Sequence, residues 1–288
     1  MIEANDRLIG QSAMRKAIMK ILVTTPAGRI GRRILGELLA QEIERTTRVT
    51  VERKLNLGGT LICHQAIVAG QIDAYVEYTG TALEAILKHP KESDANHVYE
   101  IVKKDYQDRF GIEWTEPLGF NNTFVIVVRG SDAEKNHLKT ISDAAPLTKN
   151  WTAGFGYEFV EREDGYPGLK KLYDLRFPSA PKVMDLGLTY KALANGQVDV
   201  IAGNSTDGLI DSLHLFPLED DKHYFPPYDA APLLRRETAE KHPEVRKALL
   251  ALAGGISERD MRKLNYAVDG EHREVAVVVR EFLDSKKL

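Results

Sequence analysis

The stretch that decides the fold occurs twice. Residues 66–79 read AIVAGQIDAYVEYT, and residues 192–205 read ALANGQVDVIAGNS, at an offset of 126 positions. Both contain the pattern Ala-x-x-x-Gly-Gln-(Ile or Val)-Asp-(Ala or Val). A glycine commonly ends a helix, and the apolar run that follows is typical of a buried strand. The repeat predicts two structurally equivalent lobes; the alternative is a chance match of two helix–glycine–strand junctions.

Outward from the repeat, short β-branched runs alternate with longer amphipathic ones, which indicates an α/β architecture. The helix expected over 31–46 would place Ile34, Leu35, Leu38, Leu39 and Ile43 on one buried face. Further strands are expected over 20–25, 49–55, 74–76, 124–129, 153–155 and 198–202, and further helices over 60–68, 81–87, 168–175, 243–253, 257–267 and 271–285.

The ends of the two repeated strands are where a ligand would bind. Open α/β sheets bind ligands beyond the carboxyl ends of their strands, with loops and helix N-termini. In the first copy this position is held by Tyr78 and Thr79, and in the second by Asn204 and Ser205. Two such lobes facing each other predict a hinged ligand trap with a cleft between them. Asp73 and Asp199, at the strand starts, are interpreted as turn-stabilising residues.

Composition restricts the class of protein. The chain has 288 residues, 39 Lys and Arg against 42 Asp and Glu, and a formal net charge of −3, which argues against nucleic acid as a partner. No apolar run approaches the ~20 residues of a membrane span. The single cysteine, Cys63, excludes an intramolecular disulfide and a cysteine-based metal cluster. No metal-ligand spacing occurs among the histidines or at the acids 219–221, so no metal and no cofactor are expected.

Four longer stretches carry a family resemblance. They are LNLGGTLICHQAIVAGQIDAYVEYTGTAL (55–83), LGFNNTFVIVVR (118–129), STDGLI (205–210) and LEDDKHYFPPYDAAPLLR (218–235). In this order and spacing the chain resembles the substrate-binding proteins of osmoprotectant ABC transporters, of the glycine betaine, choline and carnitine type. The resemblance runs from about residue 20 to the C-terminus.

The resemblance implies an α/β, two-lobed periplasmic-binding-protein fold (type II, Venus-flytrap) that closes on a small ligand and delivers it to an ABC permease in the membrane. Lobe 1 would comprise 20–122 plus 231–288, lobe 2 would comprise 123–230, and 1–19 would be an N-terminal extension. A monomer without enzymatic activity is expected, in the periplasm or otherwise outside the cytoplasm. Residues 1–20 contain no continuous apolar segment of a secretory signal, so this location rests on the resemblance alone.

The family's usual ligand carries a quaternary ammonium group, which is attracted to aromatic faces. The positions that match the family's aromatic box are Tyr78, Phe124, Asn204 and Tyr228. Phe124 keeps an aromatic face without the phenol, and Asn204 has no ring. The expected ligand is therefore an osmoprotectant-like zwitterion, a quaternary ammonium compound or a related amino-acid derivative, rather than choline in particular.

Additional polar contacts are expected at helix starts. Relatives carry a lysine-containing segment before the first helix, where this chain has TPAGRIGRR, so Arg29 is the candidate partner of an anionic group, with solvated surface charge as the alternative. The hydroxyls of Thr60, Thr79 and Thr81 would either cap a helix or reach the ligand. Capping is favoured for Thr79 and ligand contact for Thr81.

Two other function classes fit parts of the sequence. The segment 20–40 (KILVTTPAGRIGRRILGELLA) resembles the opening of a nucleotide-dependent oxidoreductase, with a Gly28-x-x-Gly31 turn between strand and helix. The third glycine and an acidic residue at the end of the next strand are missing, which argues against it. A sensor domain with the same fold is the other alternative, and the sequence does not separate it from a transport protein.

Overall fold

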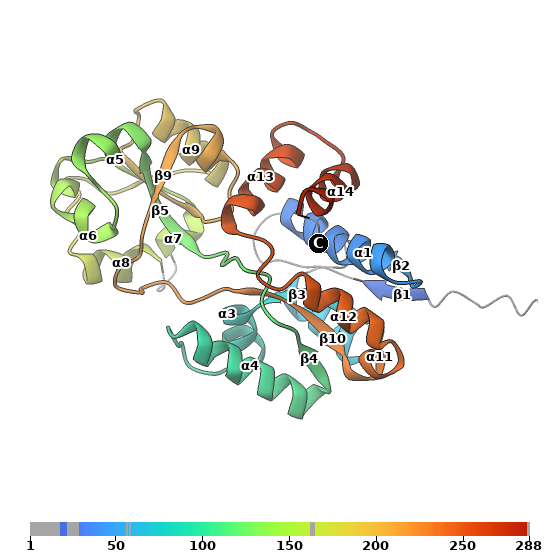
Figure 1. Ribbon diagram of the computed structural model, residues 1–288. Coiled ribbons are helices and arrows are strands. Elements are labelled where there is room, and N and C mark those ends of the chain that lie inside the picture. Colours follow the sequence, from blue (N-terminus) through green and yellow to red (C-terminus); the bar gives the residue numbers. More distant parts are fainter. Residues whose placement is uncertain (1–17, 22–28, 56, 58, 162–164, 287–288) are drawn as a thin grey trace, which may run out of the picture.

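The computed structural model describes residues 18–21, 29–55, 57, 59–161 and 165–286. The chain forms two lobes, each built on a five-stranded mixed sheet (Figure 1). The first sheet has the order β2-β1-β3-β10-β4, and its strands are β1 (Ile18–Ile21), β2 (Thr50–Arg53), β3 (Ala74–Tyr78), β4 (Ile112–Trp114) and β10 (Ala230–Arg235). The second has the order β7-β6-β8-β5-β9, and its strands are β5 (Phe124–Arg129), β6 (Ala153–Phe155), β7 (Lys182–Val183), β8 (Val200–Asn204) and β9 (Leu215–Leu218).

The two sheets have the same topology. In each, three neighbouring strands are parallel (β2, β1, β3 and β7, β6, β8), and the third of them pairs antiparallel with a strand from elsewhere in the chain, β10 or β5. That strand pairs antiparallel with the last strand of its sheet, β4 or β9. The α/β architecture expected from the sequence is therefore confirmed.

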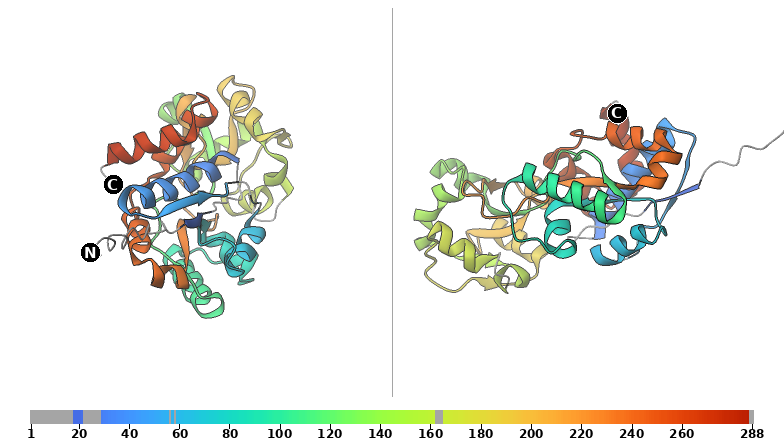
Figure 2. Two further views of the ribbon diagram at one scale, coloured as in Figure 1. Left: turned by 90° about the vertical axis from the view of Figure 1, so that its right-hand side faces the viewer. Right: turned by 90° about the horizontal axis from the view of Figure 1, so that it is seen from below.

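Helices cover both faces of each sheet. The first sheet is covered by α1 (Arg29–Thr46), α2 (Thr60–Val68), α3 (Thr79–Thr81), the π-helical turn η1 (Ala82–Ile86), α4 (Ala95–Phe110), α11 (Arg236–Lys241), α12 (Pro243–Ala251), α13 (Glu258–Asp269) and α14 (Val275–Lys286). The second is covered by α5 (Gly130–Asn136), α6 (Ile141–Ala144), the 3₁₀ turn η2 (Ala145–Asn150), α7 (Tyr157–Glu161), α8 (Tyr166–Tyr173), α9 (Leu186–Ala194) and α10 (Leu209–Ser212). Figures 1 and 2 show α14 lying beside α1 on one side of lobe 1.

The core of lobe 1 forms on both sides of its sheet. On one side α1, α12, α13 and α14 pack together, and the five apolar residues predicted to form the buried face of α1 are all fully buried. On the other side α2, η1 and α4 pack around Trp114, Tyr75 and Cys63. The amphipathic pattern of residues 31–46 thus predicted the right face, although the helix begins earlier, at Arg29.

The repeat is confirmed in the backbone. Helix α2 and strand β3 have the same bounds as α9 and β8 when 126 is added to each residue number. Both helices are followed by a left-handed glycine, Gly70 with φ 69° and Gly196 with φ 71°. Because an L side chain rarely adopts such φ values, glycine is favoured at both positions.

Some expected bounds differ from those of the structure. The first strand is β1 at Ile18–Ile21 instead of 20–25, and residues 22–25 lie outside the described residues. Helix α4 and strand β10 were not expected from the sequence. Strand β10 contains Pro232 and lacks an alternating pattern, so its sequence alone does not indicate a strand. It forms a strand because it pairs with β3, which is distant in the chain.

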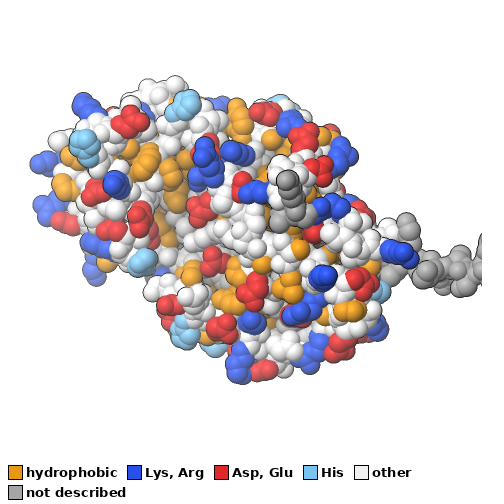
Figure 3. Space-filling model, viewed as in Figure 1, with side chains coloured by type: hydrophobic (Ala, Val, Ile, Leu, Met, Phe, Trp, Pro, Cys, Tyr) orange, Lys and Arg blue, Asp and Glu red, His pale blue; other side chains and the backbone are white. Residues whose placement is uncertain are grey.

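Two further findings concern the described residues. No helix among them is long and apolar enough to cross a membrane. Within the same residues, no group of three or more His, Cys, Asp or Glu side chains is arranged to hold a metal ion. Acidic and basic side chains are interspersed over the face of the molecule that Figure 3 presents, in keeping with the nearly balanced charge.

Candidate ligand-binding site

Tyr78 is the last residue of β3, where it pairs with Ala230 of β10 and is 3% exposed. Its ring belongs to the apolar core that also contains residues of α1 and α13. The next residue, Thr79, begins α3. The Thr79 amide donates to the carbonyl of Asp229 (3.0 Å), and its hydroxyl accepts from the Asp229 amide (3.1 Å). The expected capping role of Thr79 is therefore wrong, because its hydroxyl bonds the neighbouring segment and no side chain caps α3.

Tyr228 lies next to the same turn. A Cβ atom at Gly80 would be 2.5 Å from the Pro227 carbonyl oxygen and 3.0 Å from the Tyr228 ring. The ring is partly buried against the core that contains Tyr78. The structure thus brings Tyr78, Thr79 and Tyr228 together, and Thr81 closes the same short helix as a half-buried residue.

Phe124 and Asn204 are cross-strand partners in lobe 2. Phe124 begins β5 and Asn204 ends β8, and the antiparallel register places them opposite each other. Directly opposed residues have Cβ atoms about 5 Å apart. Both are half-buried, so this pair forms a partly accessible edge at the end of the second repeated strand.

Two further aromatic residues, which were not predicted from the sequence, pack against Phe124. The ring centroid of Phe124 is 5.2 Å from that of Phe159 and 5.9 Å from that of Phe225, and Phe159 and Phe225 are 6.2 Å apart. Phe225 lies inside a quoted family stretch, which could have indicated it. Phe159 is on the short helix α7 and no pattern in the sequence pointed to it.

Two of the motif stretches connect the lobes. The chain passes between the lobes along residues 115–123 and again along 226–230, and we call these two antiparallel segments the hinge segments. They are joined by hydrogen bonds from the Leu118 amide to the Ala230 carbonyl (2.8 Å) and from the Asn122 amide to the Tyr228 carbonyl (3.0 Å). The Asn121 side chain accepts from the Tyr228 amide at 2.8 Å.

The STDG stretch is tied to the first of these segments. The Ser205 hydroxyl donates to the Asn121 carbonyl (2.6 Å), and the Thr206 hydroxyl donates to the Asn122 side-chain oxygen (2.7 Å). From the other side, Arg262 of α13 donates to the Ser205 carbonyl at 2.8 Å. These motif residues therefore hold the backbone that carries Phe124, Asn204 and Tyr228.

Three carboxyl groups near this hinge are withdrawn from water. Burial raises the pKa of Asp207, Asp229 and Glu258 above the ordinary values of aspartic and glutamic acid. For Glu258 the neighbouring charge of Asp229 adds a smaller upward contribution to the pKa, opposed by Arg262 and by a hydrogen bond with the Asn121 backbone.

The remaining predicted residues lie apart or outside the described side chains. Thr60 is the first residue of α2 and is half-buried, and no side chain caps that helix. Arg29 is the first residue of α1, but its side chain lies outside the described part of the structure. The glycine turn of the oxidoreductase alternative, 28–31, also lies partly outside it.

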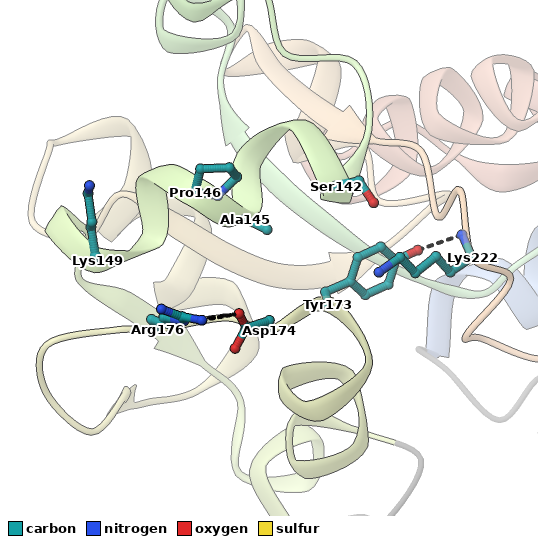
Figure 4. Close-up of a pocket in the computed structure, with 8 residues that line it drawn as sticks. All are labelled: Ser142, Ala145, Pro146, Lys149, Tyr173, Asp174, Arg176 and Lys222. Carbon is teal, nitrogen blue, oxygen red and sulfur yellow. Dashed lines mark hydrogen bonds and ion pairs between the residues drawn. The ribbon is translucent and has the colours of Figure 1, made fainter.

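A pocket of about 420 Å³ lies on lobe 2, away from the predicted residues (Figure 4). Among its charged groups, Arg176 pairs with Asp174 (2.5 Å), and the Lys222 ammonium lies 4.9 Å from the centre of the Tyr173 ring. The Tyr173 hydroxyl donates to Asp220 at 2.5 Å. None of the predicted ligand-binding residues lines this pocket.

The predicted residues thus form two groups beside the two hinge segments, one at the end of each repeated strand. Tyr78, Thr79 and Tyr228 belong to one group, and Phe124 and Asn204 to the other. Two lobes of one topology, connected by paired segments with aromatic side chains on either side, define the class of hinged, two-lobed binding proteins.

Comparison with known proteins gives the family. The profile of the substrate-binding domain of the ABC-type glycine betaine transport system matches residues 11–285. The chain belongs to this family of transport substrate-binding domains. The recognition made from the sequence is confirmed, and the oxidoreductase alternative receives no support.

Individual relatives and a solved structure agree with the family. The carnitine transport binding protein OpuCC of Listeria monocytogenes is 41% identical over 252 residues, which is 87% of this chain and 82% of that protein. The ergothioneine transport permease/ergothioneine binding protein EgtU of Helicobacter pylori is 36% identical over 87% of this chain and 45% of its own length. A crystal structure described as a glycine betaine/carnitine/choline ABC transporter superposes with a TM-score of 0.86 at 34% identity, covering 93% of this chain and 98% of that one.

Proposed function

We propose that this chain captures a small zwitterionic or quaternary-ammonium-like solute between its lobes and delivers it to a membrane permease. Family members are extracytoplasmic binding proteins of transporters that work with membrane permease components, rather than enzymes. The observation that carries the proposal is the placement of Tyr78, Phe124, Asn204 and Tyr228. These residues are far apart in the sequence, yet all lie at strand ends or hinge segments beside one double crossing.

Each side chain has a role in the proposal. Tyr78 and Tyr228 supply aromatic faces for a cation, Phe124 supplies an apolar wall backed by Phe159 and Phe225, and the Asn204 amide supplies a directional hydrogen bond. Arg29 would neutralise an anionic group of the ligand, and the hydroxyls of Thr60 and Thr81 would add polar contacts. The Thr79 hydroxyl would hold the hinge segment through its bond with the Asp229 amide.

The relatives' names point to candidate ligands. They include carnitine and ergothioneine, and the family itself is named for glycine betaine. All three combine a positively charged quaternary nitrogen with a carboxylate. We also propose that the protein is a monomer in the periplasm or an equivalent compartment, with lobe 1 formed by 20–122 and 231–288, lobe 2 by 123–230, and 1–19 as an extension.

A thermal-shift panel tests the ligand class. A ligand that binds only the folded state raises the melting temperature. The panel contains glycine betaine, choline, carnitine, ergothioneine and free amino acids, with NADPH for the oxidoreductase alternative. A shift with a quaternary ammonium compound and none with NADPH is expected; the reverse result would contradict the proposal.

Two variants then test the site. Tyr78 is too deeply buried for truncation to alanine to be informative, since the cavity alone would destabilise the fold. Tyr78→Leu and Tyr228→Leu keep apolar volume and remove the ring, and each is expected to weaken binding by about 1–3 kcal/mol. Tyr106→Leu, a buried tyrosine in the other core of lobe 1, is the control. It should lower stability and leave ligand affinity unchanged by calorimetry.

A further inference from the structure

Helix α13 joins the two lobes at a place separate from the hinge segments. Its residues Met261, Leu264 and Val268 are buried in the core of lobe 1, where the helix packs against α1 and α14. The same helix also contacts α10 of lobe 2. Figure 1 shows it between the helices of lobe 2 on one side and α14 and α1 on the other. Helix α13 is therefore a third, non-covalent connection between the lobes.

Polar contacts fix α13 to the segment that follows strand β8. The Arg262 guanidinium donates to the Ser205 carbonyl (2.8 Å), and its Nε lies 3.0 Å from the Asp211 carboxylate. The Asn265 side chain donates to the Thr206 carbonyl (2.8 Å). Residues three apart on a helix share a face, so Arg262 and Asn265 act together. We call these three contacts the clasp.

The clasp is closely packed. A Cβ atom at Gly208 would lie 2.6 Å from the Cβ of Tyr266 and 2.9 Å from the Arg262 carbonyl oxygen, so the backbone of lobe 2 rests directly on α13. The Arg262 side chain is only 13% exposed. Solvent and salt screen a partly buried ion pair less than an exposed one. The contact between Arg262 and Asp211 therefore contributes to the clasp at physiological salt.

In lobe 2 the clasp and the proposed ligand residues lie on opposite faces of the sheet. Successive side chains of a strand point to opposite faces. Ala202 packs in the core that Phe124 adjoins, and Asn204, two residues later and opposite Phe124, belongs to the same face. Ile201 packs on the other face with Ile210 of α10, the helix that α13 contacts.

This placement makes the clasp and ligand capture compete. Closure about the hinge segments turns the face of Phe124 and Asn204 toward Tyr78 and Tyr228, and it turns the opposite face, with α10, away from α13. Figure 1 agrees, because α13 lies above the place where the chain crosses between the lobes, whereas α3, which directly follows Tyr78, lies below it. Closing the lobes on a ligand therefore requires the clasp contacts to separate.

We propose that α13 holds the lobes open through the clasp, and that Arg262 and Asn265 are positioning residues that set ligand affinity without touching the ligand. This inference deepens the proposed function and rests on it. The apparent affinity of a ligand for a closed form is reduced by the fraction of molecules that can close. Each clasp contact lowers that fraction, so the clasp keeps binding weaker than the ligand-binding residues alone would make it. Weakening the clasp should therefore tighten binding.

The first test measures the affinity of the full chain for glycine betaine by calorimetry. Asn265→Ala and Asp211→Asn should each bind about fivefold more tightly, the scale of one hydrogen bond, and the double variant should gain about the product. Lys263→Ala, an exposed position of the same helix, is the control for Asn265→Ala. Glu113→Gln is the control for Asp211→Asn, because Glu113 pairs with Arg246 (2.6 Å) within lobe 1. Both controls should bind like the wild type.

The second test measures the distance between the lobes without any ligand. Spin labels on the exposed positions Lys104→Cys of α4 and Lys171→Cys of α8 report this distance by pulsed electron paramagnetic resonance. The native Cys63 is fully buried and is not expected to react with the label. The clasp variants should gain a population at a shorter distance, whereas the two control variants should keep the wild-type distance.

The outcomes separate the clasp from the function on which it rests. Tighter binding cannot arise from a loss of folded protein, so it supports the clasp even if a variant is less stable. Unchanged affinity together with an unchanged distance would overturn the clasp and leave the proposed function standing. Weaker binding with a longer distance would overturn it as well, because the contacts would then belong to the closed form. If the wild type binds no compound of the ligand panel, the proposed function fails, and the label distances alone decide on the clasp.

Discussion

The first copy of the repeat, residues 60–81, and the second, residues 186–207, share a backbone but differ in side chains where the strands end. Their helix bounds, left-handed glycines and strand bounds agree at one offset. Tyr78 in the first copy is replaced by Asn204 in the second, and the buried Glu77 is replaced by Gly203. The shared backbone therefore depends on the glycine, aspartate and apolar positions, whereas the residues proposed to contact the ligand differ between the lobes.

The starting aspartates show a smaller divergence. Asp199 accepts from Arg129 Nη2 and from the Thr152 amide, both at 2.8 Å. Asp73, its counterpart, accepts from the Thr238 hydroxyl at 2.8 Å. The sequence interpretation of both as turn-stabilising residues agrees with these bonds. The Asp199 carboxylate binds a guanidinium and a backbone amide, and the Asp73 carboxylate binds a hydroxyl of α11.

The largest expected loss of stability comes from adding a side chain at Gly203, where the first copy has Glu77. A Cβ atom there would lie 2.0 Å from the Tyr190 hydroxyl oxygen. Tyr190 is fully buried and its oxygen accepts from the Asn204 amide, so it has no room to move away. Gly203→Ala should lower the free energy of unfolding by about 3 kcal/mol, measured by urea denaturation.

Gly187→Ala on α9 is the matched control for this change, since a Cβ atom there meets nothing within 4 Å. It should leave stability unchanged or raise it by up to about 1 kcal/mol, because alanine is the better helix former. Equal stability of the two alanine variants would contradict the steric argument at Gly203.

Removing Asp199 tests the start of the second repeated strand. Asp199→Ala is expected to cost about 2 kcal/mol of stability, since it breaks a charge-assisted bond and leaves a backbone amide without its acceptor. Urea denaturation measures the loss, and a variant as stable as the wild type would refute it.

Asp207 introduces a pH dependence that its counterpart, Thr81, lacks. Burial raises the pKa of Asp207 in the folded state. The stability that this group contributes is therefore fully present below its unfolded pKa, and it is lost as the pH rises through the folded pKa. The stability of Asp207→Asn minus that of the wild type should therefore be lower at pH 3 than at pH 7.

Asp143 provides a control of opposite sign. Hydrogen bonds from the Thr140 and Lys139 amides lower the pKa of this exposed carboxyl. Its contribution to stability is present above the unfolded pKa and is lost as the pH falls through the folded value. Asp143→Asn should therefore be relatively less stable at pH 7, and thermal melts of both variants at the two pH values should diverge in opposite directions.

The smallest expected effect comes from placing an aromatic ring at the end of the second repeated strand. Asn204→Tyr makes the strand ends equal in residue type and adds an aromatic face beside Phe124. Affinity for a ligand with a trimethylammonium group should rise by about fivefold, the scale of one cation–π contact. Calorimetry with glycine betaine measures the change, and a loss of affinity would show that the amide of Asn204 is the more important group.

Periodic patterns allowed much of the fold to be predicted from the sequence. The repeat and the apolar face of α1 are local signals, and both are confirmed. Strand β10 could not be predicted from local sequence, because its partner β3 is distant in the chain and Pro232 interrupts the strand pattern. Helix α4 carries a sequence signal of its own, the N-cap residue Asp94, which accepts from the His97 amide.

The candidate site could be predicted only in part. Family motifs located the residues around the hinge, but a motif does not tell whether a side chain holds the backbone or faces the ligand. Thr79, Ser205 and Thr206 turn out to bond the hinge segments. Phe159 reaches Phe124 through the packing of α7, a contact that depends on the assembled lobe.

The antiparallel entry of β10 into the first sheet has a consequence for how the protein is made. The second sheet uses strands from Phe124 to Leu218, so all of them leave the ribosome together. The first sheet waits for β10, because β4 pairs only with that strand among the described residues. Lobe 2 can thus fold during synthesis while β4 still lacks a paired strand and β3 is paired only with β1. The segment most exposed to misfolding and to chaperones is therefore the earlier one.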